Sequence, residues 1–180
     1  MPLTKLNATL GLTGSLPAVS GANLTGIDGK VKQVITSSIN STGSTTTQIP
    51  FDDTIPQNTE GAEIITATIT PTSASTKLII SHNASFSQQN YNGYIYALFQ
   101  DSTADALKSW FRDRNGDSGG QVVDNAHFQY VMTSGTTSAT TFKFRGGPCG
   151  SYTFYWGDDR GSGRGGGTYE KASMTIIEVE

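Results

Sequence analysis

The chain has 180 residues, a formal net charge of −3 and a single cysteine, Cys149. This length allows one domain of about 130 residues beside a shorter segment. The weak negative charge argues against nucleic acid and anionic membrane surfaces as partners, and one cysteine excludes an internal disulfide or a CxxC metal site. No apolar stretch reaches the roughly 18 residues of a membrane span, and the first residues do not read as a secretory signal. We therefore expect a protein made in a cytoplasm, without membrane insertion.

Residues 1–48 are predicted to form an extended arm that becomes ordered only against another surface. Their apolar side chains stand singly among Gly, Ser, Thr and Asn, and nothing repeats with the 3.6-residue period of a helix. Such a segment buries too little apolar area to offset the entropy of ordering its backbone. The candidate anchoring residues are isolated apolar positions of this arm: Leu16, Pro17, Val19, Leu24 and Ile27.

A period of two, typical of β-strands, appears weakly in residues 30–39 and clearly in residues 63–70, where Ile65, Ala67 and Ile69 alternate with threonines. Seven further segments have strand composition and are separated by turn-forming residues: 77–86, 93–100, 106–111, 126–133, 140–147, 151–157 and 172–179. The pattern predicts about nine strands and no helix of useful length.

Residues 49–180 are therefore predicted to form an all-β domain, most simply an antiparallel jelly-roll β-sandwich. Two sets of aromatic residues share a strand face and are expected in the core: Phe142 with Phe144, and Tyr152, Phe154 and Trp156. Residues 49–60 contain two prolines, which cannot donate to a central ladder, so they should run along an edge or in a loop. We expect three apolar side chains to anchor this connector: Ile49, Phe51 and Ile55.

One motif suggests an enzyme. Residues 116–120 read Gly-Asp-Ser-Gly-Gly, the string around the nucleophile of trypsin-like serine proteases. That chemistry requires a histidine to accept the proton of Ser118, and the chain offers only His82 and His127, neither in the sequence context of that family. A glycine-rich turn is the favoured interpretation, so no catalytic residue is assigned.

Adjacent carboxylates at Asp158 and Asp159, followed by Arg160 and a glycine-rich run, are the nearest approach to an ion site. Calcium requires six to eight oxygen ligands, and no spaced set of acidic or amide residues accompanies this pair. The other acidic residues lie mostly in expected loops, which does not favour the facing carboxylates of a glycoside hydrolase. We therefore expect no metal, no cofactor and no enzymatic activity.

Four segments resemble proteins of bacteriophage tails. Residues 16–27, LPAVSGANLTGI, resemble a linker repeated in tail-fibre and tail-tip proteins. Residues 49–61 and 67–78 resemble the start of a phage fibre head domain, and residues 173–179, SMTIIEV, resemble its end. Such heads are similar to the trimeric jelly rolls of the tumour necrosis factor and complement type.

This resemblance implies a non-enzymatic virion protein that is assembled in the host cytoplasm. It would form a homotrimeric short fibre or tail appendage, with the N-terminal arm docked on other virion proteins and the β-head displaying loops to a host-surface glycan or protein. The outward Tyr155 is expected to pack against a neighbouring subunit. The alternative is a capsid fibre, decoration or baseplate component without a receptor.

The receptor contacts are expected in three loops, residues 88–93, 113–120 and 157–167. The candidate contact residues are polar or aromatic side chains in or beside these loops: Tyr91, Tyr94, Asp158, Asp159, Arg160 and Arg164.

Overall fold

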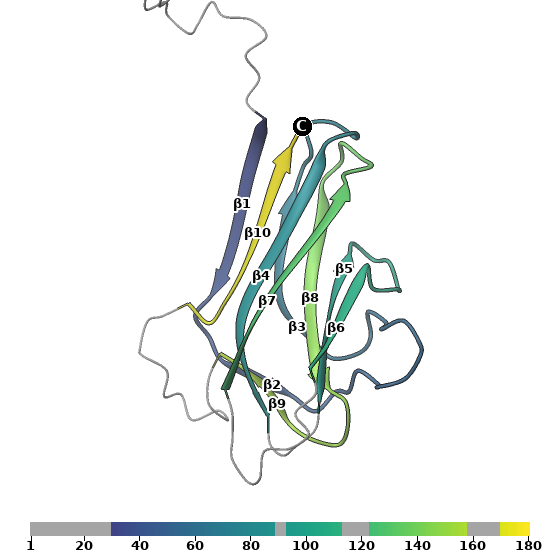
Figure 1. Ribbon diagram of the computed structural model, residues 1–180, viewed down its shortest axis with the longest axis vertical. Helices are drawn as coiled ribbons and strands as arrows, with labels where there is room; N and C mark the ends of the chain where they lie inside the picture. Colours follow the sequence, from purple (N-terminus) through teal and green to yellow (C-terminus); the bar gives the residue numbers. More distant parts are fainter. Residues whose placement is uncertain (1–29, 89–92, 113–122, 158–169) are drawn as a thin grey trace, which may run out of the picture.

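The computed structural model describes residues 30–88, 93–112, 123–157 and 170–180. These residues form ten strands and no helix, as Figure 1 shows. The strands are β1 (Val31–Ile39), β2 (Gly43–Thr45), β3 (Ala62–Ile69), β4 (Lys77–Gln88), β5 (Tyr94–Gln100), β6 (Lys108–Arg112), β7 (Val123–Thr133), β8 (Thr140–Pro148), β9 (Phe154–Trp156) and β10 (Ala172–Val179). The nine predicted strands are all present, and the short β2 is an addition.

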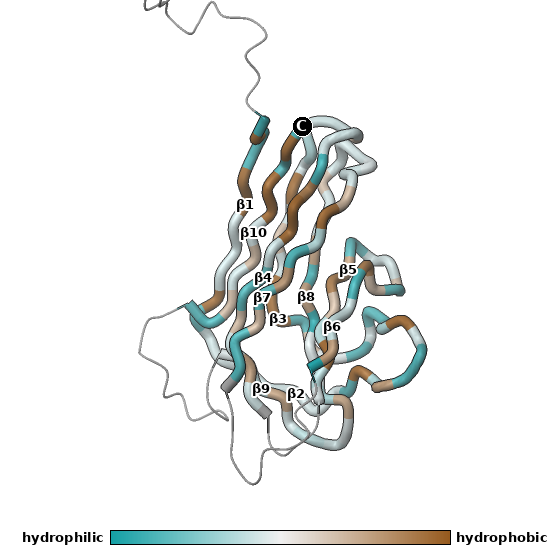
Figure 2. Tube along the Cα trace, viewed as in Figure 1, coloured by the Kyte–Doolittle hydropathy of each residue, from teal (hydrophilic) through white to brown (hydrophobic). Residues whose placement is uncertain are grey.

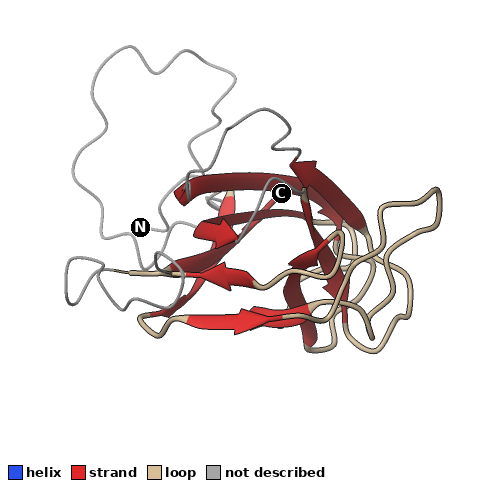
Figure 3. Ribbon diagram, turned by 90° about the horizontal axis from the view of Figure 1, so that it is seen from below, coloured by secondary structure: helices blue, strands red, loops and turns tan. Residues whose placement is uncertain are grey.

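The strands form two antiparallel sheets that pack face to face (Figure 3). The first sheet has the order β1-β10-β4-β9-β2, with β7 also paired to β4, and the second has the order β3-β8-β5-β6. Apart from the β5-β6 hairpin, successive long strands alternate between the sheets, so that β1, β4, β7 and β10 belong to one and β3, β5, β6 and β8 to the other. This is the jelly-roll arrangement of a β-sandwich, which confirms the predicted fold class.

The core lies between the sheets and is rich in aromatic rings. Phe142 and Phe144 of β8 are 0% and 1% exposed, as their alternation predicts. Trp110 of β6 and Phe128 of β7 pack together with ring centroids 4.6 Å apart and ring planes tilted by 35°, and this contact closes the sandwich between the two edge strands. Burial of each large aromatic side chain contributes about 1.5–3 kcal/mol.

Strand β5 does not alternate, because both of its faces are buried. Its inward residues Tyr94, Tyr96 and Leu98 belong to the core between the sheets. Residues 47–61 lie against the outward side of the second sheet, where the Ile49 amide donates to the Pro148 carbonyl oxygen of β8 at 3.1 Å and Phe51 stacks on Phe111 of β6. Arg145 of β8 holds this segment, since its guanidinium donates to the carbonyl oxygens of Glu60 (2.8 Å) and Gly61 (2.9 Å).

The packing of residues 47–61 requires a glycine beneath them. A Cβ at Gly147 would lie 2.5 Å from the Thr47 carbonyl oxygen and 3.0 Å from the Gly61 Cα. Ile49 is fully buried at this contact, whereas Phe51 and Ile55 are 65% and 54% exposed. Of the three predicted anchors of the connector, only Ile49 is therefore an anchor, and the prediction for Phe51 and Ile55 was wrong.

The predicted boundary between arm and head, at residues 48 and 49, was placed too late in the chain. Strand β1 pairs with β10 along its length, and β2 pairs with β9, so both belong to the head. The alternation of β1 is weak because its exposed face carries Thr36 and Ser38 beside Val31 and Val34. In the second predicted aromatic set only Phe154 is fully buried, while Tyr152 and Trp156 are half-buried.

Candidate binding surfaces

The predicted receptor contact Tyr94 is not a surface residue. It is 0% exposed and packs among Phe86, Tyr96 and Phe154, and its hydroxyl donates to the Asp124 carboxylate at 3.2 Å. The prediction was wrong because a tyrosine next to a turn can point inward when the strand it begins is buried on both faces. The other predicted contacts lie outside the described residues: Tyr91, Asp158, Asp159, Arg160 and Arg164.

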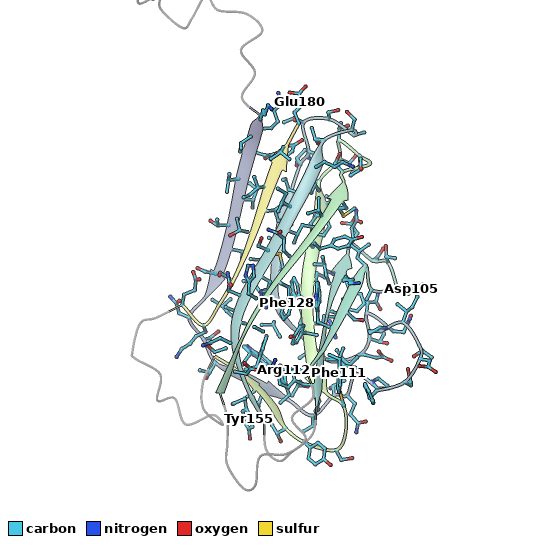
Figure 4. The ribbon with its side chains drawn as sticks, in the orientation of Figure 1. Asp105, Phe111, Arg112, Phe128, Tyr155 and Glu180 are labelled. Atoms are coloured by element: carbon cyan, nitrogen blue, oxygen red, sulfur yellow. The ribbon has the colours of Figure 1, made fainter. Side chains whose placement is uncertain are left out.

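The predicted anchoring residues also lie outside the described part of the chain: Leu16, Pro17, Val19, Leu24 and Ile27. The structure does show where the described chain begins. The amide of Glu180 donates to the carbonyl oxygen of Lys30 at 2.9 Å, and the side chain of Lys32 forms a 2.8 Å ion pair with that of Glu180. The start of the head and its C-terminus therefore lie together at one end of the sandwich, where Figure 4 labels Glu180.

The three predicted receptor loops begin at the opposite end. The described chain breaks after Gln88, Arg112 and Gly157. Register brings these places together, since Phe86 of β4 lies opposite both Asp124 of β7 and Trp156 of β9. We call this the loop end and the other the arm end; both are visible in Figure 1.

An apolar row crosses the outward face of the β1-β10-β4-β7 sheet near the arm end (Figure 2). Register places one residue of each strand in this row: Val34, Ile177, Ile79 and Val131. Val34 and Val131 are each 53% exposed, and Val31, one outward position nearer the arm end, is 55% exposed. We call these five residues the apolar row. Contiguous exposed apolar surface of this kind commonly marks an interface.

Towards the loop end the same face becomes polar. The next outward positions are Thr36, Thr175, Ser81 and Gln129, followed by Ser38, Ser173, Asn83 and His127. Beyond them a hollow of about 300 Å³ opens beside β4, β7 and the start of β10. Its polar lining comprises Asn83, Ser85, Asn125, His127, Glu170 and Lys171.

A buried carboxylate ties the strands together at the arm end. Glu178 of β10 is 0% exposed and accepts hydrogen bonds from Gln33 Nε2 (2.6 Å), Thr76 Oγ1 (2.7 Å), and both the amide and the hydroxyl of Thr72 (2.8 Å each). Burial of the carboxyl group raises its pKa, but the bonds from Gln33, Thr76 and Thr72 together lower the pKa of Glu178 to about 2. The Glu178 carboxylate therefore links β10 to Gln33 of β1 and to Thr72 and Thr76 of the turn before β4, and we call these four residues the Glu178 clasp.

His82 lies in the core and not at a catalytic site. Its ring stacks on Phe144 with centroids 4.2 Å apart, and Nδ1 donates to the Ser173 carbonyl oxygen at 2.9 Å. Because a carbonyl only accepts, this bond places the ring proton on Nδ1, and Nε2 has no partner among the described residues. Burial lowers the pKa of His82 to about 4. The Ser118 motif lies outside the described residues.

Two exposed aromatic residues stack on the outer side of the second sheet. Phe51 of the 47–61 segment and Phe111 of β6 have ring centroids 4.3 Å apart and are 65% and 43% exposed. Figure 4 labels Phe111 beside Arg112, whose side chain forms a 2.8 Å ion pair with Asp124 across the edge of the sandwich.

Within the described ranges no three His, Cys, Asp or Glu side chains gather as a metal site. Nor does that part of the chain contain a helix with the length and apolar character needed to cross a membrane. Neither a protein-family model nor the sequence of a curated protein matches the chain.

The apolar row and the polar hollow were missed from the sequence. Val34, Ile79, Val131 and Ile177 are far apart in the chain and become neighbours only through strand register. One sequence signal could have indicated the apolar row. In β10, Ile177 and Val179 form an apolar face opposite the buried Met174 and Ile176. A strand that is apolar on both faces indicates that its outer face is also covered.

Proposed function

We propose that the protein is a non-enzymatic bacteriophage virion component. In this proposal it is a short trimeric fibre or tail appendage whose arm docks on another virion protein. Its jelly-roll head then presents the loop end to the host surface. The resemblance of residues 16–27, 49–61 and 173–179 to phage fibre proteins supports this proposal, and so does the jelly-roll fold.

The observation that carries the proposal is the opposite placement of the two ends of the head. The described chain begins at Lys30, beside Glu180, at the arm end. The described residues that lead into the three predicted receptor loops, Gln88, Arg112 and Gly157, lie at the loop end. A protein fastened at one end of a sandwich can extend the other end outward, as an adhesin requires.

The apolar row supports self-association. Its five residues carry no charge, and three of them are more than half exposed. A second copy of the same neutral face meets no like-charge repulsion there, and the removal of apolar surface from water favours the contact. Three copies held together would bind a repetitive host surface far more tightly than one copy, because the second and third sites bind at a high effective concentration.

Substitutions in the apolar row test the oligomer. For the full chain we expect light scattering to give about three times 19.1 kDa, and Val34→Asp with Val131→Asp to give a monomer of unchanged melting temperature. Ile55→Asp is the matched control, since Ile55 is 54% exposed but lies outside the row. A wild-type protein of monomer mass would refute the trimer.

A binding assay on host cells tests the adhesin role. Purified trimer should bind cells more than an unrelated protein of similar charge, and the Val34→Asp and Val131→Asp monomer should bind much more weakly. If the trimer binds cells no more than the unrelated protein, the adhesin role is refuted. A purely structural virion role, such as a capsid fibre, decoration or baseplate part, then remains.

A further inference from the structure

We propose that the hollow near the loop end, between Asn83, Ser85, Asn125, His127 and Glu170, is a binding site for a single sugar ring of a host-surface glycan. This inference rests on the proposed host-binding function and names the ligand class and the residues. The hollow is lined by described residues, and none of them belongs to the predicted receptor loops.

Two cross-strand pairs orient the polar groups of the site. His127 Nδ1 donates to Asn83 Oδ1 at 2.7 Å, and Ser85 Oγ donates to Asn125 Oδ1 at 2.7 Å. Both amide oxygens are thereby occupied by protein donors, and the two amide nitrogens remain as donors for another molecule. The neutral His127 ring, protonated on Nδ1, presents Nε2 as an acceptor.

Strand register holds these pairs in place. Asn83 lies opposite His127, and Ser85 lies opposite Asn125, on the outward face of β4 and β7. Between them, three alanines are in register across β10, β4 and β7 and also line the hollow: Ala172, Ala84 and Ala126. The side chains of Ala84 and Ala172 belong to the core between the sheets, so the side chains that face outward around the hollow are polar.

The polar groups that line the hollow indicate which class of ligand fits it. Amide donors, an imidazole acceptor, a hydroxyl and the carboxylate of the exposed Glu170 match a ring of hydroxyl groups, since each hydroxyl both donates and accepts. The lining contains no large apolar side chain for an apolar ligand, and Glu170 balances the charge of Lys171, so the hollow has no net positive charge to attract an anion such as a phosphate. A volume of about 300 Å³ is at the lower limit for small-molecule sites, so it suits one ring better than an oligosaccharide.

Each site is expected to bind weakly. Hydrogen bonds between neutral groups replace bonds to water and add little individually, so we expect a dissociation constant on the order of 1 mM for one ring. Display on a trimer would compensate for this weakness. The apolar row occupies the arm end of the same face, so association through it leaves the loop end of the face for the glycan.

The test uses the full-length protein and the methyl glycosides of glucose, galactose, mannose and N-acetylglucosamine. With two histidines in the chain, the His127 ring resonances are assigned by comparison with His127→Gln and followed by NMR as glycoside is added. We expect at least one glycoside to shift them. Asn125→Asp keeps the acceptor for Ser85 and removes the amide donor, so it should weaken binding about tenfold, as expected for one hydrogen bond.

Gln129→Glu is the matched control, because it makes the same amide-to-carboxylate change on the outward face of β7, outside the hollow. The inference is overturned if no glycoside shifts the His127 resonances, if both variants bind like the wild type, or if inorganic phosphate shifts them and the glycosides do not. It is also overturned if wild-type and Asn125→Asp trimers bind cells equally. A monomeric protein whose His127 still responds to a glycoside would instead refute the proposed function and support the site.

Discussion

Protonation of His82 is expected to destabilise the fold as the pH falls from 6.5 towards 4. In the unfolded chain the imidazole has the ordinary pKa of 6.5, whereas burial among aromatic rings lowers the pKa of His82 to about 4 in the folded protein. The unfolded state therefore binds the proton first. Stability from the neutral ring is complete above pH 6.5 and is lost as the pH falls through about 4.

The magnitude follows from the two pKa values. They differ by about 2.5, and each pKa unit corresponds to about 1.4 kcal/mol, which gives a total loss of about 3 kcal/mol. About 2 kcal/mol of this loss is expected by pH 5. Since domains of this kind are stable by about 5–15 kcal/mol, the loss is a substantial part of the total.

Urea unfolding at several pH values between about 7 and about 4 measures this loss. His82→Leu removes the titrating ring, so its free energy of unfolding should fall less steeply over this range. His127→Gln removes an imidazole whose charge also lowers the pKa of His82, so it should reduce the loss of stability without abolishing it. The reasoning is wrong if His82→Leu and the wild type lose the same free energy, or if NMR shows His82 titrating near pH 6.5.

Two further predictions concern other parts of the head. Glu178→Gln should lower the free energy of unfolding by about 1.5–3 kcal/mol, because hydrogen bonds to a charged acceptor are replaced by bonds to a neutral one. It should also abolish the loss of stability that the wild type shows as the pH falls from 4.5 through about 2. A variant as stable as the wild type above pH 5 would show that the Glu178 clasp does not stabilise the fold. Gly147→Ala should cost about 1–3 kcal/mol because the added methyl group meets the Thr47 carbonyl, and limited proteolysis should show faster cleavage within residues 47–61. Unchanged proteolysis would show that this segment does not depend on the glycine.

The strands could be located from the sequence because a sandwich buries one face of most of its strands. Burial of one face imposes a period of two, and Ile65, Ala67 and Ile69 of β3 show that period and are buried. The same reasoning placed Phe142 and Phe144 in the core. The all-β class therefore followed from alternation and spacing, whereas the order of the strands in the two sheets did not.

The sequence misled where a second layer covers a strand. Both faces of β5 are buried, so its residues do not alternate, and nothing local in the chain shows that Tyr94 points into the core between the sheets. Phe51 and Ile55 were misplaced for the opposite reason, since an apolar residue in a loop is as compatible with the surface as with the core. Such distinctions depend on which distant segment packs on top.

Local pattern by itself determined the strands, their turns and the aromatic core, because alternation records the burial of one strand face. Tertiary structure alone decided the surfaces on which function depends. Register aligned Val34, Ile177, Ile79 and Val131 into one row, and it paired Asn83 with His127 beside Asn125. These residues come from strands that are far apart in the sequence. Their proximity depends on how the sheets are ordered, which no periodicity within a single strand records.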